Sequence, residues 1–131
     1  MQKMTNLTLV DSSAWVGYLR AKLDPEIAER IRENLRTKTV AMTAPIWFEL
    51  YQGVRSRRED EDLKNLREVS IWLDFDHLCW EMAARNGRAC LRAGVNVPFG
   101  DLLVHACSRR YQVKLLHCDR HFEMIDAVCP A

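Results

Sequence analysis

Short apolar segments alternate with longer amphipathic ones along the whole chain, and this alternation limits the possible fold more than any other feature. Each apolar segment has the length and the Val, Leu, Ile and Met content of a buried strand. Strands joined through helices pair in parallel and are covered on both faces, so the sequence predicts an α/β fold with a short central parallel sheet of about four to five strands. The expected strands are residues 7–10, 40–42, 69–73 and 113–116.

The segments between these strands predict seven helices. The clearest is residues 25–35, where Ile27, Ile31 and Leu35 recur every fourth residue among Glu and Arg, as in a helix with one buried face. Asp24 provides its N-cap and Pro25 its first helical position. One further helix is expected after an N-cap at Ser12 or Ser13, and another from Thr43, with Trp47, Leu50, Tyr51 and Val54 along one face. The remaining four are expected over residues 55–68, 76–93, 101–111 and 119–125, and Gly94 is the expected C-cap of the helix over residues 76–93.

Length and charge restrict the class of protein. With 131 residues, 48% apolar content and no Gly/Ser/Pro-rich linker, we expect a single globular domain, residues 1–131. No apolar run approaches the roughly 20 residues of a membrane span, and residues 1–6 lack the start of a signal peptide. We therefore expect a cytoplasmic protein without membrane contact. The net charge of only +1 argues against coating nucleic acid by bulk electrostatics.

Five cysteines without any CxxC pair favour free thiols in a reducing compartment. A structural zinc site that combines His117, Cys118 and His121 with His105 and Cys107 is the less favoured alternative, because no second cysteine pair completes it.

Three windows of 16 residues each contain a single charged side chain, although 28% charged residues should place about 4.5 in each. In every window that side chain is a carboxylate, which is costly to bury without a partner. Carboxylates that converge need a cation between them, and Mg²⁺ or Mn²⁺ suits oxygen ligands. The windows are residues 4–19 with Asp11, 39–54 with Glu49, and 93–108 with Asp101.

A structural role remains open for each acid taken alone. Asp11 can be a helix N-cap, Glu49 a surface residue, and Asp101 a favourable charge near a helix N-terminus. Asp119, which follows the last predicted strand, can likewise start a helix. The argument for a site therefore depends on the whole set, and on the tendency of ligands to bind at the carboxyl ends of parallel strands.

Around these acids the chain resembles the PIN-domain ribonucleases of the VapC toxin type. The order, spacing and total length all fit, and the likeness covers nearly the whole chain. Four segments carry it: Leu9–Trp15 around Asp11, Glu49–Gly53, Pro98–Leu103 around Asp101, and Leu115–Phe122 around Asp119.

The resemblance implies a metal-dependent endoribonuclease toxin that is neutralised by a cognate VapB-like antitoxin and commonly forms a homodimer. It implies that Asp11, Glu49, Asp101 and Asp119 are catalytic and hold one or two Mg²⁺ or Mn²⁺ ions, and that Ser12 supports them. The alternatives are a PIN nuclease that acts in RNA processing, and a non-catalytic interaction module that retains the fold.

Three histidines depart from the family pattern. His117 stands where Thr or Ser is common, and we expect it to support the site from outside the ligand set. His121 replaces a second Asp, so no fifth acidic ligand is expected there. His105 replaces a small residue one turn after Asp101, and space filling is favoured over hydrogen bonding to the site.

Overall fold

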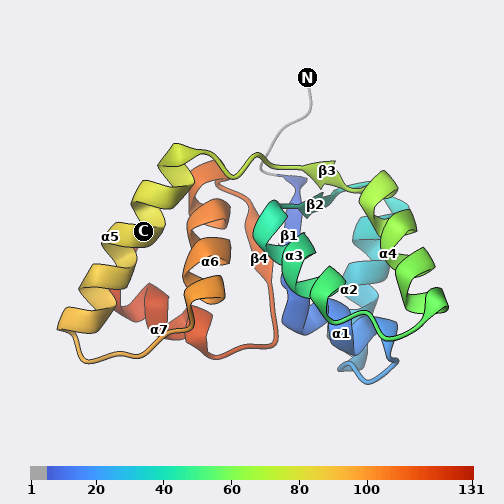
Figure 1. Cartoon of the computed structure of the whole chain (residues 1–131), viewed down its shortest axis with the longest axis horizontal. Coiled ribbons are helices and arrows are strands. Elements are labelled where there is room, and N and C mark those ends of the chain that lie inside the picture. The colour runs from blue at the N-terminus through green and yellow to red at the C-terminus, as the bar shows by residue number, and fades with distance from the viewer. Residues whose placement is uncertain (1–5) are drawn as a thin grey trace.

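The computed structural model describes residues 6–131; residues 1–5, to which the expectation of no signal peptide partly refers, lie outside the described residues. The described part contains four strands and seven helices in the predicted order (Figure 1). The strands are β1 (Thr8–Val10), β2 (Val40–Met42), β3 (Ile71–Trp72) and β4 (Lys114–Leu116). The helices are α1 (Ser12–Leu19), α2 (Pro25–Arg36), α3 (Ala44–Gln52), α4 (Arg57–Val69), α5 (His77–Arg92), α6 (Phe99–Tyr111) and α7 (His121–Val128).

All strand pairs are parallel, and the sheet order is β3-β2-β1-β4. In the view of Figure 1, α5, α6 and α7 lie on one side of the sheet and α1 to α4 on the other. This arrangement confirms the predicted α/β fold with a short central parallel sheet. Among the described residues, no helix combines the length and apolar character needed to cross a membrane.

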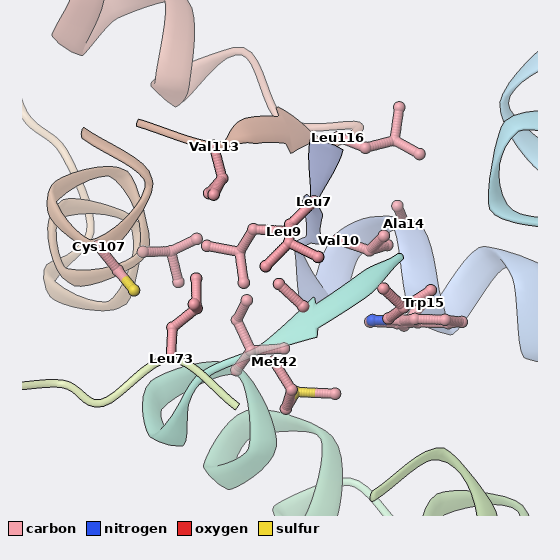
Figure 2. Packing of buried hydrophobic residues seen from close by; sticks show 14 of the residues in the cluster. Leu7, Leu9, Val10, Ala14, Trp15, Met42, Leu73, Cys107, Val113 and Leu116 are labelled. Atoms are coloured by element: carbon pink, nitrogen blue, oxygen red, sulfur yellow. The ribbon is translucent and has the colours of Figure 1, made fainter. Parts of the chain in front are cut away.

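The core follows from the alternation of side chains along β1. Leu9 and Val10 are fully buried on opposite faces of the sheet, because successive side chains of a strand point to opposite sides. Figure 2 shows Leu9 on the side of Cys107 from α6, whereas Val10 lies beside Ala14 and Trp15 at the start of α1. Both faces of the sheet are therefore closed by helices, which explains why its strands read as continuous apolar runs.

One strand boundary and one helix cap differ from the prediction. The strand expected at residues 69–73 is only Ile71–Trp72, because α4 continues through Val69. Asp11, and not Ser12 or Ser13, is the N-cap of α1: its Oδ2 accepts a hydrogen bond from the Ser13 amide at 3.1 Å. Asp11 therefore directly follows β1 and caps α1, which fixes the direction of its carboxylate.

The inward face of α3 also differs from the expected stripe. Ile46 and Leu50 are buried, whereas Tyr51 is 54% exposed. Tyr51 and Trp47 instead form an aromatic pair at the rim of the helix, with ring centroids 6.0 Å apart. The helix is thus rotated relative to the expected face, so the side of α3 that carries Glu49 is not simply its solvent side.

Candidate metal centre

The first acid of the set, Asp11, is buried at the end of β1, where only 2% of its surface is exposed. Its backbone amide donates to the Leu116 carbonyl of β4 at 2.9 Å, so the ends of both central strands hold it. Oδ2 is engaged by the Ser13 amide as the helix cap. Oδ1 is buried and has no hydrogen-bond partner, which is an unusual and costly state for a carboxylate oxygen.

Asp101 is the second buried acid and lies in the first turn of α6. Only 7% of its surface is exposed, and its Oδ2 is also buried without a partner. Burial raises the pKa of Asp101 to about 7; the hydrogen bond with Asp119 and the charges of Asp119, Asp11 and Glu49 act in the same direction. A carboxylate surrounded by three others resists ionisation unless a cation joins them.

Asp119 and His121 come from the turn that joins β4 to α7. Asp119 Oδ1 accepts a hydrogen bond from the His121 amide at 2.9 Å. Burial by itself raises the pKa of Asp119, but the hydrogen bonds from His121 and Asp101 outweigh it, so the net pKa is lowered. Asp119 thus carries its negative charge more readily than Asp101 does.

Glu49 projects toward this group from α3. Although the residue is largely exposed, its carboxylate lies close to Gly100, where an added Cβ would be 3.2 Å from Oε1. Partial burial raises the pKa of Glu49, and the charges of Asp11 and then Asp119 raise it further, against a hydrogen bond with Ser12. Glu49 is therefore an exposed residue, as one interpretation of the sequence expects, and its carboxylate is still close enough to Asp11 and Asp119 for their charges to raise its pKa.

The supporting residues named from the sequence lie beside the acids. Ser12 lies close enough to Glu49 to lower the pKa of its carboxyl group. His117 Nδ1 accepts a hydrogen bond from the Asp119 amide at 3.2 Å, and its ring packs 4.7 Å from that of Phe122. His117 thus holds the turn that carries Asp119.

His105 takes no part in the acidic group. Its Nε2 lies 2.7 Å from Asp126 Oδ1, and the same oxygen accepts from Arg109. Burial lowers the pKa of His105, and the hydrogen bond to Asp126 opposes that effect. His105 therefore ties α6 to α7 through a hydrogen bond to Asp126, a role that neither sequence interpretation describes.

The sequence names His121 only in the zinc alternative and as a departure from the family pattern, and not as a neighbour of the acids. Within residues 6–131, the group of potential metal ligands whose atoms lie within 4.8 Å of one another consists of Asp101, Asp119 and His121, and does not include Asp11 or Glu49. The position of His121 two residues after Asp119, where the resemblance implies that a second Asp is common, was the available signal. No cysteine belongs to that group, so the described residues do not support the zinc alternative.

An apolar hollow adjoins the acids. Phe48, Phe75, Trp80 and Phe99 line it together with Glu49 and Gly100. The rings of Trp80 and Phe99 lie 6.2 Å apart, and Phe48 and Phe99 are 65% and 67% exposed. Exposed aromatic rings next to a charged centre are suited to holding a flat or apolar group of a ligand.

Comparison with known proteins identifies similar chains. Residues 8–128 match the PIN domain family. Ribonuclease VapC11 of Mycobacterium tuberculosis is 31% identical over 123 residues, which cover 91% of each chain. Two solved structures share the fold at low identity. VapBC2 from Rickettsia felis, bound to a promoter DNA fragment, has a TM-score of 0.74 and 12% identity, covering 91% of this chain and 92% of that one. DNA-bound VapBC from Salmonella typhimurium has a TM-score of 0.69 and 17% identity, covering 82% of each chain.

Proposed function

Because the chain belongs to the PIN-domain family, we propose that it is an endoribonuclease toxin of the VapC type, which hydrolyses RNA phosphodiester bonds with a divalent cation. The observation that carries this proposal is the group of Asp101, Asp119 and His121, whose potential ligand atoms lie within 4.8 Å of one another, together with the buried carboxylate of Asp11 that follows β1. The relatives that are named ribonucleases support the choice of RNA as substrate.

The donor set fits one or two Mg²⁺ or Mn²⁺ ions. Asp11 Oδ1 and Asp101 Oδ2 are buried oxygens without any hydrogen-bond donor, and carboxylate oxygens are the ligands that these ions prefer. Asp11 and Asp101 are the proposed direct ligands, and Glu49 and Asp119 complete the centre. When bound, the ion supplies an activated water and offsets the charge that develops on the phosphate.

The side chains have distinct tasks in this mechanism. Asp11 and Asp101 are fixed by a helix cap and a helix start, so their positions are set before RNA arrives. Glu49 is the most accessible acid, and its raised pKa suits it to take a proton from the attacking water. The Ser12 hydroxyl favours the charged form of the Glu49 carboxylate, while His117 keeps the Asp119 turn in place.

A VapB-like antitoxin is the proposed partner. The similar solved structures are VapBC complexes, and in this chain the hollow lined by Phe48, Trp80 and Phe99 lies directly beside Glu49. A segment with apolar side chains that fills this hollow would lie across the approach to the acids. Occupation of the hollow would therefore exclude RNA from the centre.

The test is RNA cleavage by the purified protein with Mg²⁺ or Mn²⁺, compared with excess chelator. Wild type should cleave only when the metal is present, and Asp101→Asn should lose cleavage because it removes one ligand charge. Asp74→Asn makes the same chemical change at an exposed position and should cleave like wild type. Equal cleavage by wild type and Asp101→Asn, or cleavage that persists in chelator, would contradict the proposal.

A further inference from the structure

The imidazole of His121 lies inside the acidic group, although the sequence assigns only carboxylates to it. His121 is the first residue of α7, and its amide bond to Asp119 Oδ1 fixes the backbone there. Its Nδ1 lies 2.7 Å from Asp119 Oδ1 and 3.3 Å from Asp101 Oδ2. When Nδ1 carries no proton, one nitrogen and two oxygens with lone pairs therefore converge on a common space.

These contacts are ion pairs only when His121 is protonated, and their angles are not those of hydrogen bonds. Asp101 Oδ2 and His121 Nδ1 are both buried atoms without a hydrogen-bond partner. Only 7% of the surface of Asp101 is exposed. A buried carboxylate oxygen that lacks a donor is costly. The cost is removed when a cation binds the oxygen, and the same cation can take the free imidazole nitrogen as a second kind of ligand.

The spacing fits direct coordination. Metal bonds to imidazole nitrogen and carboxylate oxygen are about 2.0–2.2 Å long, so neighbouring ligand atoms around one octahedral ion lie roughly 3 Å apart. The separations of 2.7 Å and 3.3 Å from Nδ1 bracket that value.

We propose that His121 Nδ1 is a direct metal ligand in this chain, and that this nitrogen makes the centre prefer Mn²⁺ over Mg²⁺. Mg²⁺ takes oxygen ligands almost exclusively, whereas affinity for nitrogen increases along the first-row transition metals. This inference rests on the proposed function only in assuming that the metal centre lies among these acids. Which metal the centre prefers does not follow from the proposed function.

Pulsed electron paramagnetic resonance of Mn²⁺ bound to the full-length protein, without RNA, tests the ligand directly. Wild type should show hyperfine coupling to one ¹⁴N nucleus. His121→Asp should still bind Mn²⁺ through an all-oxygen set but lose that coupling. His77→Asp removes an exposed histidine with the same change of charge and should keep it. Mn²⁺ bound to wild type without ¹⁴N coupling would overturn the inference while leaving the proposed nuclease intact.

Metal competition tests the selectivity. Loss of groups that merely support a metal ligand costs about 10- to 100-fold in affinity, so replacing the nitrogen ligand itself should narrow the Mn²⁺/Mg²⁺ affinity ratio at least about tenfold in His121→Asp. An unchanged ratio would overturn the proposed preference. If wild type binds neither ion, the metal centre of the proposed function fails as well, which distinguishes the two failures.

Discussion

Replacement of Asp101 by Asn should stabilise the metal-free protein while removing its activity. The pKa of Asp101 is raised from 3.8 in the unfolded chain to about 7 in the folded protein, first by burial and then by the neighbouring acids. The folded state therefore holds a proton that the unfolded state releases. Stability falls as the pH rises from 3.8 toward 7, because the unfolded chain has released this proton and folding must take it up again. Asn mimics the protonated acid and avoids this cost.

The magnitude follows from the size of the shift. Each pH unit between the two pKa values is worth about 1.4 kcal/mol. The stability advantage of Asp101→Asn should grow by roughly 2 kcal/mol from pH 5 to pH 7 and level off above pH 7. Coupling with Asp119 makes this an upper value, because the two acids share the proton.

The assay is urea unfolding of wild type and Asp101→Asn at several pH values in excess chelator. The informative quantity is the difference in unfolding free energy between the two proteins. The lowered pKa of His105 makes the stability of both proteins rise with pH near neutrality, and this shared effect cancels in the difference. The difference in unfolding free energy between wild type and Asp74→Asn should not change with pH. An Asn variant that is less stable than wild type at pH 8, or a difference that does not change with pH, would refute the reasoning.

Three further predictions concern growth, access and packing. Expression of wild type without its antitoxin should arrest a bacterial host and Asp101→Asn should not; equal growth curves would count against a toxin. Gly100→Ala places a Cβ 3.2 Å from the Glu49 carboxylate and should slow RNA cleavage with little change in unfolding temperature. Unchanged cleavage would show that the close contact between Gly100 and Glu49 does not matter for activity. Asp126→Ala leaves buried His105 without its partner and should cost about 1–3 kcal/mol of stability in urea unfolding, while cleavage per folded molecule is unchanged; loss of activity instead would tie His105 to the centre.

The fold could be predicted from the sequence because its local signals agree. The apolar strand at residues 40–42 and the Asp24–Pro25 helix start were placed correctly, and a parallel sheet follows from their alternation with helices. The misplaced N-cap of α1 has a local cause: Asp, Ser and Ser in succession are all good caps, and only the pairing of β1 with β4 selects Asp11.

The candidate centre was only partly predictable. The scarcity of charge around Asp11, Glu49 and Asp101 marked the acids, because isolated carboxylates in apolar elements stand out in composition alone. The direction of Glu49 was not accessible, since it depends on how α3 is rotated against its neighbours. The convergence of His121 on the same group depends on the turn after β4, whose geometry no residue pattern fixes.

The most direct test of the account is the location of a bound ion. Crystals grown with Mn²⁺ should give an anomalous scattering peak within about 2.0–2.3 Å of carboxylate oxygens of both Asp11 and Asp101, near Glu49 and Asp119. Absence of a peak at saturating Mn²⁺, or an ion bound only elsewhere on the chain, would contradict the claim that these four acids form one metal centre.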